Sequence, residues 1–145
     1  MTTPLHRLVG TPLMALLIAS AAPAHADDSL YQALGQRDGL ARLMDDFVPR
    51  LFSDPRLKPF FKDTNAKHLQ TQLTMQLCEV SGGPCRYDGP DMKAAHQDMG
   101  VDRAAFNALV DVLQQAMDAQ GLPFGTQNRL LARLAPMHRD IVTRP

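Results

Sequence analysis

Residues 78–101 read CEVSGGPCRYDGPDMKAAHQDMGV, and this stretch decides how the rest of the chain is interpreted. It contains both cysteines of the protein, two Gly-Pro pairs and one histidine, His96. Gly-Pro pairs interrupt regular structure, so residues 81–91 are predicted to form a long loop. A short helical turn capped by Asp91 then leads to His96 and ends at Gly100.

On both sides of this stretch, apolar residues recur at spacings of three and four, which indicates amphipathic helices. Strand patterns are nearly absent. We predict helices over residues 27–34, over 38–51 with Asp38 as the cap and a kink or early end at Pro49, and over 65–81 with Thr64 or Asn65 as the cap. Further helices are predicted over 102–121 with Asp102 as the cap, and over 126–141 with Thr126 as the cap and a bend at Pro136. The fold class is therefore predicted to be all-α.

Composition excludes some partners. The chain of 145 residues has 15 basic and 15 acidic side chains, so its net charge does not attract it to nucleic acid or to an anionic membrane. We expect neither as a partner, and we expect a monomer.

The first 26 residues differ from the remainder. A weakly basic start is followed by an apolar run over residues 8–22, and Ala24-His25-Ala26 has small residues where a signal peptidase cleaves. The run is shorter than the roughly 20 residues that a membrane-spanning helix needs. We expect a cleaved signal peptide at residues 1–26, a single domain at 27–145 and export, to the periplasm. An uncleaved N-terminal anchor is the alternative.

Export favours oxidation of thiols. Cys78 and Cys85 are seven residues apart with a flexible turn between them, so we expect a disulfide. A zinc site would need more ligands, and covalent attachment of a c-type haem would need a CxxCH motif that the chain lacks.

His96 is the histidine that stands out. It follows two alanines, whose small side chains allow a flat group to approach closely. Neutral imidazole is a common metal ligand. When only the spacing is considered, however, a histidine at this position is more often a partly buried core residue. Neither a nucleophile elbow nor a phosphate-binding glycine motif is present.

The chain resembles the group I truncated haemoglobins, small globins with a two-over-two helical sandwich that encloses haem. The resemblance covers about residues 29–143. The matching residues are Ser29-Leu30-Tyr31-x-x-Leu34-Gly35, Asp46-Phe47, Asp54-Pro55-Arg56-Leu57, Pro59-Phe60-Phe61, Gly82-Gly83-Pro84, Tyr87-x-Gly89, Met92-Lys93-x-x-His96, Phe106 and Leu134-Ala135-Pro136.

This resemblance implies non-covalent haem b, with His96 as the proximal iron ligand. It implies that Phe61 stacks on the haem and that His68 and Lys93 are candidates for propionate contacts. The other residues that it places around the haem are Phe47, Leu69, Leu73, Leu77, Met92, Val101, Phe106, Met117 and Leu134.

The departures concern the gas-binding side. Family members commonly have a tyrosine after the Asp-Phe pair, where this chain has Val48. Distal positions that often carry a polar residue align with Leu69 and Leu73, which leaves Gln72 and Gln76 as possible hydrogen-bond donors. His68 and Gln72 are also the candidates for a protein ligand at the sixth iron position. A donor stabilises the partial negative charge on bound O2 by about 1–3 kcal/mol, so we expect fast O2 release and a smaller effect on CO and NO.

The resemblance implies reversible binding of O2, CO or NO, for carriage or sensing, with an electron donor that the sequence does not identify. An NO dioxygenase or weak peroxidase is the alternative, and a haem-free helical interaction module is a third possibility. An apolar distal side and an exported location both disfavour efficient enzymatic turnover.

Overall fold

The computed structural model describes residues 29–144, and within this range the chain is all-α, as predicted. The expected signal peptide lies outside the described residues. The α-helices are α1 (Ser29–Ala33), α2 (Gln36–Ser53), α3 (Ala66–Val80), α4 (Met92–His96), α5 (Arg103–Ala119), α6 (Phe124–Leu134) and α7 (His138–Ile141). Two 3-10 turns, η1 (Lys58–Phe60) and η2 (Ala135–Met137), join them.

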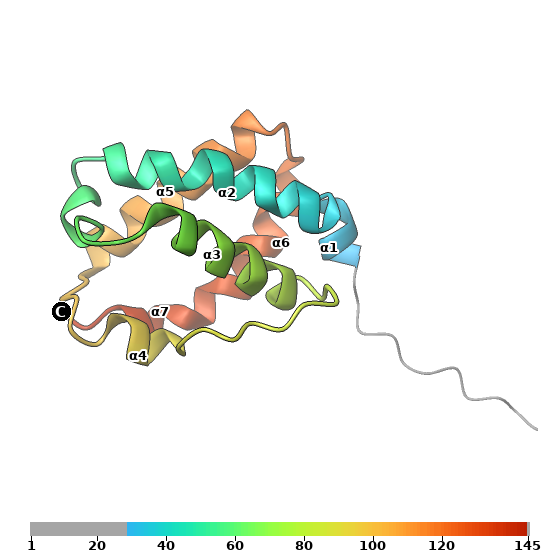
Figure 1. Cartoon of the computed structure of the whole chain (residues 1–145). Helices are drawn as coiled ribbons and strands as arrows, with labels where there is room; N and C mark the ends of the chain where they lie inside the picture. The colour runs from blue at the N-terminus through green and yellow to red at the C-terminus, as the bar shows by residue number, and fades with distance from the viewer. Residues whose placement is uncertain (1–28, 145) are drawn as a thin grey trace, which may run out of the picture.

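Four long helices form the body of the molecule (Figure 1). α2 packs against α3 and against α5, and α5 also packs against α6. α2 and α3 run in opposite directions, so they form one pair, and α5 and α6 form the second. This is the two-over-two arrangement that the sequence predicted.

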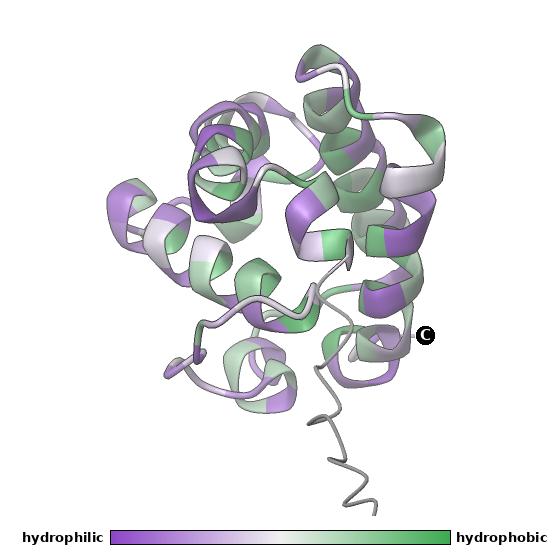
Figure 2. Cartoon of the chain, turned by 90° about the vertical axis from the view of Figure 1, so that its right-hand side faces the viewer, coloured by the Kyte–Doolittle hydropathy of each residue, from purple (hydrophilic) through white to green (hydrophobic). Residues whose placement is uncertain are grey.

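The core lies between the two pairs. Each long helix carries both hydrophobic and hydrophilic residues (Figure 2), as expected for helices with one buried face. The fully buried side chains include Leu30, Leu40, Leu43, Met44, Leu51, Val112, Met117 and Leu130. Burial of these apolar groups is the main source of the stability of the fold.

Side-chain caps determine where three helices begin. Asn65, Asp91 and Asp102 each accept a hydrogen bond from the backbone N–H three residues later, at 2.9, 2.7 and 2.8 Å. These bonds satisfy N–H groups that have no partner within the helix. All three caps were predicted.

Two predicted caps were wrong. α6 begins at Phe124, so Thr126 lies inside its first turn, and α2 begins at Gln36, with Asp38 in its first turn. Gly35, whose φ of +77° favours glycine, precedes α2.

Pro49 does not end α2, which continues to Ser53. The proline lies on the exposed side of the helix, while its neighbour Val48 is buried. Water can bond the carbonyl that loses its partner, and the buried face holds the helix together.

The connection between α3 and α4 has no helix of its own (Figure 1). It extends along one side of α3, and the backbone N–H of Tyr31 donates to the Ser81 carbonyl at its start. A Cβ atom at Gly83 would lie 2.6 Å from the Tyr31 ring and 2.7 Å from Cys78 Sγ, so only glycine fits there. The structure joins Cys78 to Cys85 in a disulfide with a Cα–Cα distance of 5.7 Å.

Within residues 29–144, no helix has the length and apolar character needed to cross a membrane.

Removal of the disulfide should weaken the fold. Closure of so short a loop restricts the unfolded chain, so the double variant Cys78→Ser/Cys85→Ser should lose about 2–3 kcal/mol of the free energy of unfolding. Urea denaturation followed by circular dichroism measures this. Reductant should lower the stability of the unmodified protein equally, and identical midpoints with and without reductant would show that the bond does not form.

Candidate functional site

A mainly apolar cavity of about 450 Å³ lies between the two helix pairs. All four long helices contribute to its wall, together with α4, the α3–α4 connection, η2 and α7. Its size is within the range of cavities that hold cofactors. The lining residues are Met44, Phe47, Leu51, Phe61, Thr64, Leu69, Gln72, Leu73, Gln76, Leu77, Tyr87, Met92, Ala95, His96, Met99, Phe106, Leu109, Val110, Leu113, Leu131, Leu134, Ala135, Met137 and Ile141.

His96 is the last residue of α4 and lies in the cavity wall. Its Nδ1 is 2.7 Å from the carbonyl oxygen of Met92, one turn earlier. A carbonyl only accepts hydrogen bonds, so Nδ1 carries a proton, and Nε2 is the nitrogen that has a lone pair when the ring is neutral. This arrangement prepares Nε2 to bind a metal and also determines the orientation of the ring.

Among the described residues, no group of three or more His, Cys, Asp or Glu side chains is placed to hold a metal ion. A protein-only metal cage therefore does not form around His96. A single imidazole in an apolar cavity would instead suit a metal whose other ligands come from a macrocycle.

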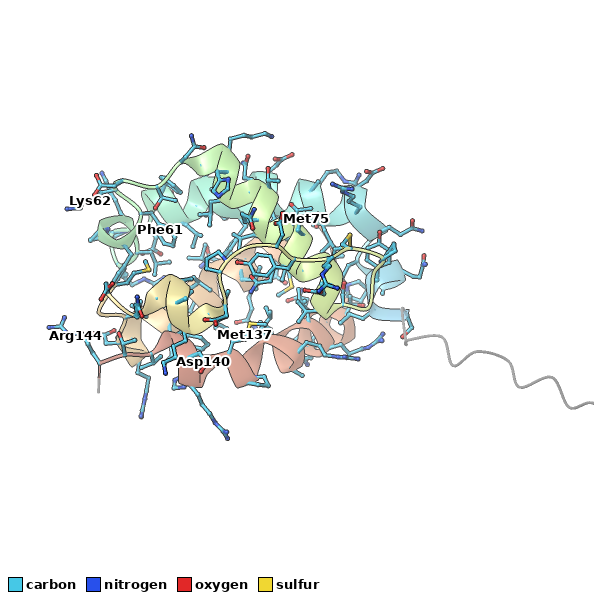
Figure 3. All side chains as sticks on the ribbon, turned by 60° about the horizontal axis from the view of Figure 1, so that its bottom comes forward. Phe61, Lys62, Met75, Met137, Asp140 and Arg144 are labelled. Atoms are coloured by element: carbon cyan, nitrogen blue, oxygen red, sulfur yellow. A yellow bond between two sulfur atoms is a disulfide. The ribbon has the colours of Figure 1, made fainter. Side chains whose placement is uncertain are left out.

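One stripe of α3 and two phenylalanines form the apolar walls. Leu69, Leu73 and Leu77 follow one another at a spacing of four and all face the cavity. Phe47 joins them from α2, and Phe61 closes one end, with its ring 5.7 Å from that of Phe52. Figure 3 shows Phe61 near the end of the molecule that also carries Arg144.

Two glutamines are the polar side chains of α3 in the wall. Gln76 Nε2 lies 3.2 Å from the sulfur of Met92 and 4.0 Å from that of Met137, which Figure 3 labels. Gln72 Oε1 is buried and has no hydrogen-bond partner. An unpaired buried oxygen is costly, so Gln72 lines the cavity at a cost to the stability of the fold.

Most of the residues that the sequence placed around a haem do line this cavity. They are Phe47, Phe61, Leu69, Gln72, Leu73, Leu77, Met92, His96, Phe106 and Leu134.

The other five lie elsewhere. Val48 and Met117 are buried in the core beside the cavity, at 1% and 0% exposure. Val101 lines a second, smaller recess. The side chains of His68 and Lys93 are on the exposed surface and do not contribute to the wall.

Sequence reasoning missed several lining residues. Leu109, Val110 and Leu113 continue the apolar face of α5 beyond Phe106, and the periodicity of that helix was a signal for them. Tyr87 comes from the α3–α4 connection, where no periodicity exists, and its hydroxyl donates to the Pro90 carbonyl at 2.9 Å. Burial raises the pKa of Tyr87, with a further contribution from the nearby Asp88 carboxylate.

Comparison with known proteins identifies the family. The family model "Bacterial-like globin" matches residues 29–143. The group 1 truncated hemoglobin GlbN of Mycolicibacterium paratuberculosis is 30% identical over 79% of this chain and 85% of its own length. The group 1 truncated hemoglobin of Tetrahymena pyriformis is 26% identical over 79% of this chain and 94% of its own.

Solved structures show the same fold. The crystal structure of the Tetrahymena pyriformis truncated hemoglobin in its Fe(III) form matches with a TM-score of 0.75 and 26% identity, and covers 78% of this chain and 97% of that chain. The 2/2 hemoglobin of Synechococcus, solved with covalently attached heme, has a TM-score of 0.74 at 21% identity over 79% of this chain and 98% of that chain. The single histidine in an apolar cavity, the helix arrangement and these matches together show that the chain belongs to the bacterial-like globin family, as a group 1 truncated haemoglobin.

Proposed function

We propose that this protein binds haem through His96 and uses the haem iron to bind a diatomic gas reversibly. The observation that carries the proposal is the hydrogen bond from His96 Nδ1 to the Met92 carbonyl, 2.7 Å long, which leaves Nε2 free within an apolar cavity. A proximal histidine of this kind holds the iron in globins.

The cavity fits the group. Haem is a flat and largely apolar molecule, and a cavity of about 450 Å³ with aliphatic and aromatic walls suits such a ligand. Met92 and Met137 add soft, adaptable side chains at the edge of the cavity.

We propose non-covalent haem b. The two cysteines are joined to each other, so neither is available for a thioether, and the sequence has no CxxCH motif. Acidified butanone should therefore extract the haem completely. Haem that stays with the polypeptide would contradict this proposal.

Each part of the cavity has a separate task. The bound iron supplies a coordination position for the gas. The Met92 carbonyl holds His96 in the tautomer that can bind iron. The Leu69–Leu73–Leu77 stripe makes the α3 wall of the cavity apolar. Such a wall would keep water away from a bound ferrous iron and so limit side reactions.

Weak retention of O2 is the proposed consequence of this wall. The α3 stripe has no donor of its own, and the nearby amide of Gln76 faces two methionine sulfurs. Gln72 is the remaining amide in that wall. An enzyme that oxidises NO needs retained O2, so gas carriage or sensing fits this wall better than dioxygenation does.

We further propose that the protein is exported to the periplasm, acts as a monomer and depends on a separate electron donor. Ala24-His25-Ala26 and the Cys78–Cys85 bond support export. Isolation of a mature protein that begins at Asp27 would support export. A protein from the cell that still contains residues 1–26 would contradict cleavage of a signal peptide.

The proposal predicts that His96→Ala loses the haem spectrum. The purified protein supplied with haemin should give a Soret band, and the ferrous CO form should show the spectrum of a histidine-bound haem. His96→Ala should abolish this spectrum of the ferrous CO form, because His96 Nε2 is the proposed iron ligand. His68→Ala is the matched control, since His68 is on the surface, and it should change nothing. An unchanged spectrum in His96→Ala would overturn the assignment.

A donor placed in the α3 stripe should slow the release of O2. Leu73→Gln puts an amide in the wall opposite α4, and a hydrogen bond to a charged group contributes about 1.5–3 kcal/mol, which corresponds to at least a tenfold slower release. Stopped-flow measurement of O2 dissociation tests this, with Leu73→Met as an apolar control of similar volume. Equal rates in the two variants would show that the gas does not bind beside α3.

Replacement of Gln72 should stabilise the haem-free protein. Gln72→Met removes a buried oxygen without a partner, so the free energy of unfolding should rise by about 1 kcal/mol. Gln120→Met is the matched comparison. The Gln120 oxygen is also unpaired, but its Nε2 donates to the Gly39 carbonyl at 3.1 Å, so this variant should gain less or lose stability. Urea denaturation distinguishes the two, and a loss in Gln72→Met would show that the oxygen is already satisfied.

A further inference from the structure

Two methionine sulfurs in the wall of the large cavity lie beside one side-chain amide. Gln76 Nε2 is 3.2 Å from the sulfur of Met92 and 4.0 Å from that of Met137. The three residues come from α3, α4 and η2, so the fold brings them together at the cavity from distant parts of the chain. We call Gln76, Met92 and Met137 the sulfur cluster.

The amide of the cluster is poorly satisfied. Within residues 29–144, the two sulfurs are the hydrogen-bond partners of Gln76 Nε2, and no oxygen accepts from it. A thioether sulfur is only a weak acceptor. The amide would therefore bond more strongly to an oxygen atom at the position that the sulfurs now occupy.

Small molecules from the solvent can reach the cluster. The cavity is not fully enclosed, and the side chains of Met92 and Met137 are partly exposed. Met117, by contrast, is buried in the core at 0% exposure. The methionines of this chain therefore differ in access while their chemistry is the same.

We propose that Met92 and Met137 are a modification site at which a hydroperoxide oxidises the sulfur to a sulfoxide, with the Gln76 amide assisting the reaction at Met92. The step transfers one oxygen atom and two electrons. A lone pair of the sulfur attacks the outer oxygen of ROOH, and the S–O bond forms as the O–O bond breaks. The departing RO⁻ takes the proton of the transferred oxygen and leaves as ROH, so sulfur is oxidised and the peroxide is reduced.

Gln76 lies where it assists this step. The transferred oxygen becomes negatively charged as the O–O bond breaks, and an N–H group 3.2 Å from the Met92 sulfur is within reach of an oxygen bonded to that sulfur. A donor placed where charge develops lowers the barrier. The sulfoxide oxygen then remains as a strong acceptor in place of a weak one. The Met137 sulfur, at 4.0 Å, should receive less assistance.

Oxidation of the cluster should weaken the hold on the cofactor. Met92 lies one turn before His96 and supplies the carbonyl that accepts from its Nδ1. A sulfoxide replaces a flexible apolar side chain of the cavity wall by a polar one. This consequence rests on the proposed haem function, whereas the oxidation of the sulfurs does not.

Peptide mass spectrometry of the haem-free protein tests the modification. After exposure to hydrogen peroxide, Met92 and Met137 should each gain one oxygen while Met117 stays unmodified. In urea Met117 should react as well, which shows that its peptide is detected. Oxidation of Met92 no faster than that of Met117 in the folded protein would overturn the proposal, and this comparison needs no variant.

A substitution of Gln76 tests the assistance. Met75, which Figure 3 labels on α3, is partly exposed, does not line the cavity and serves as the internal reference. Gln76→Leu should lower the ratio of Met92 to Met75 oxidation at least threefold, because the donor is lost. Gln72→Leu removes an amide one turn earlier that has no hydrogen bond to a methionine within residues 29–144, and it should leave the ratio unchanged. An equal ratio in the two variants would overturn the role of Gln76.

Transfer of haem to apomyoglobin tests the consequence. Haem-free protein is oxidised, freed of peroxide and then loaded with haemin, and it should lose haem at least threefold faster than protein that was not oxidised. Met92→Leu/Met137→Leu keeps similar side-chain volumes and has no sulfur in the cluster, so its rate of haem loss should be the same with and without peroxide treatment. Equal rates in the unmodified protein would contradict the effect on the cofactor. A chain that is oxidised at Met92 and binds no haem would contradict the proposed function and leave the modification site intact.

Discussion

A helix of five residues carries the histidine on which the site depends, and such a helix cannot hold itself in place. Helices this short are unstable in isolation, because formation of the first turn loses more conformational entropy than its one hydrogen bond offsets. α4 is instead held by contacts from outside. Asp91 caps its first turn, α7 packs against it, and the C-terminal segment bonds to the Val101 carbonyl just beyond it. The position of the His96 ring thus depends in part on α7 and residues 143–144, which are far away in sequence.

The cavity opposes the stability of the fold. Side chains that face an open space lack packing partners on one side, and about 450 Å³ of the interior is such a space. The buried cluster beside the cavity, which includes Leu40, Leu43 and Val48, supplies stability without the ligand. A cofactor that binds only the folded chain adds stability in proportion to its affinity and concentration. The same cavity therefore weakens the empty fold and makes the folded chain responsive to its ligand.

The disulfide and the irregular α3–α4 connection form one unit. The connection provides Tyr87 to the cavity wall and leads into α4, but it has few backbone hydrogen bonds of its own. Cys78–Cys85 ties its start to α3, and the backbone N–H of Tyr87 donates to the Glu79 carboxylate at 3.3 Å. A covalent link thus replaces part of the order that a helix would provide. If the chain is exported, it reaches a compartment in which thiols oxidise and this link can form.

The sequence by itself determined the features that depend on local chemistry. Caps such as Asn65 and Asp102 were predictable because the side chain bonds to a backbone N–H only three residues away. The leucine stripe of α3 was predictable because its spacing matches the helical repeat. His96 stood out among the histidines because two alanines precede it, but the family pattern was needed to predict it as an iron ligand.

Only the tertiary structure decided which apolar residues face the cavity. Phe47 and Val48 are adjacent and both buried, yet Phe47 lines the cavity and Val48 enters the core, since successive helical residues point about 100° apart and α3 and α5 occupy different sides of α2. The buried, unpaired oxygen of Gln72 likewise depends on how segments distant in the sequence pack around it. Long-range packing decides these properties, and no local pattern in the sequence predicts them.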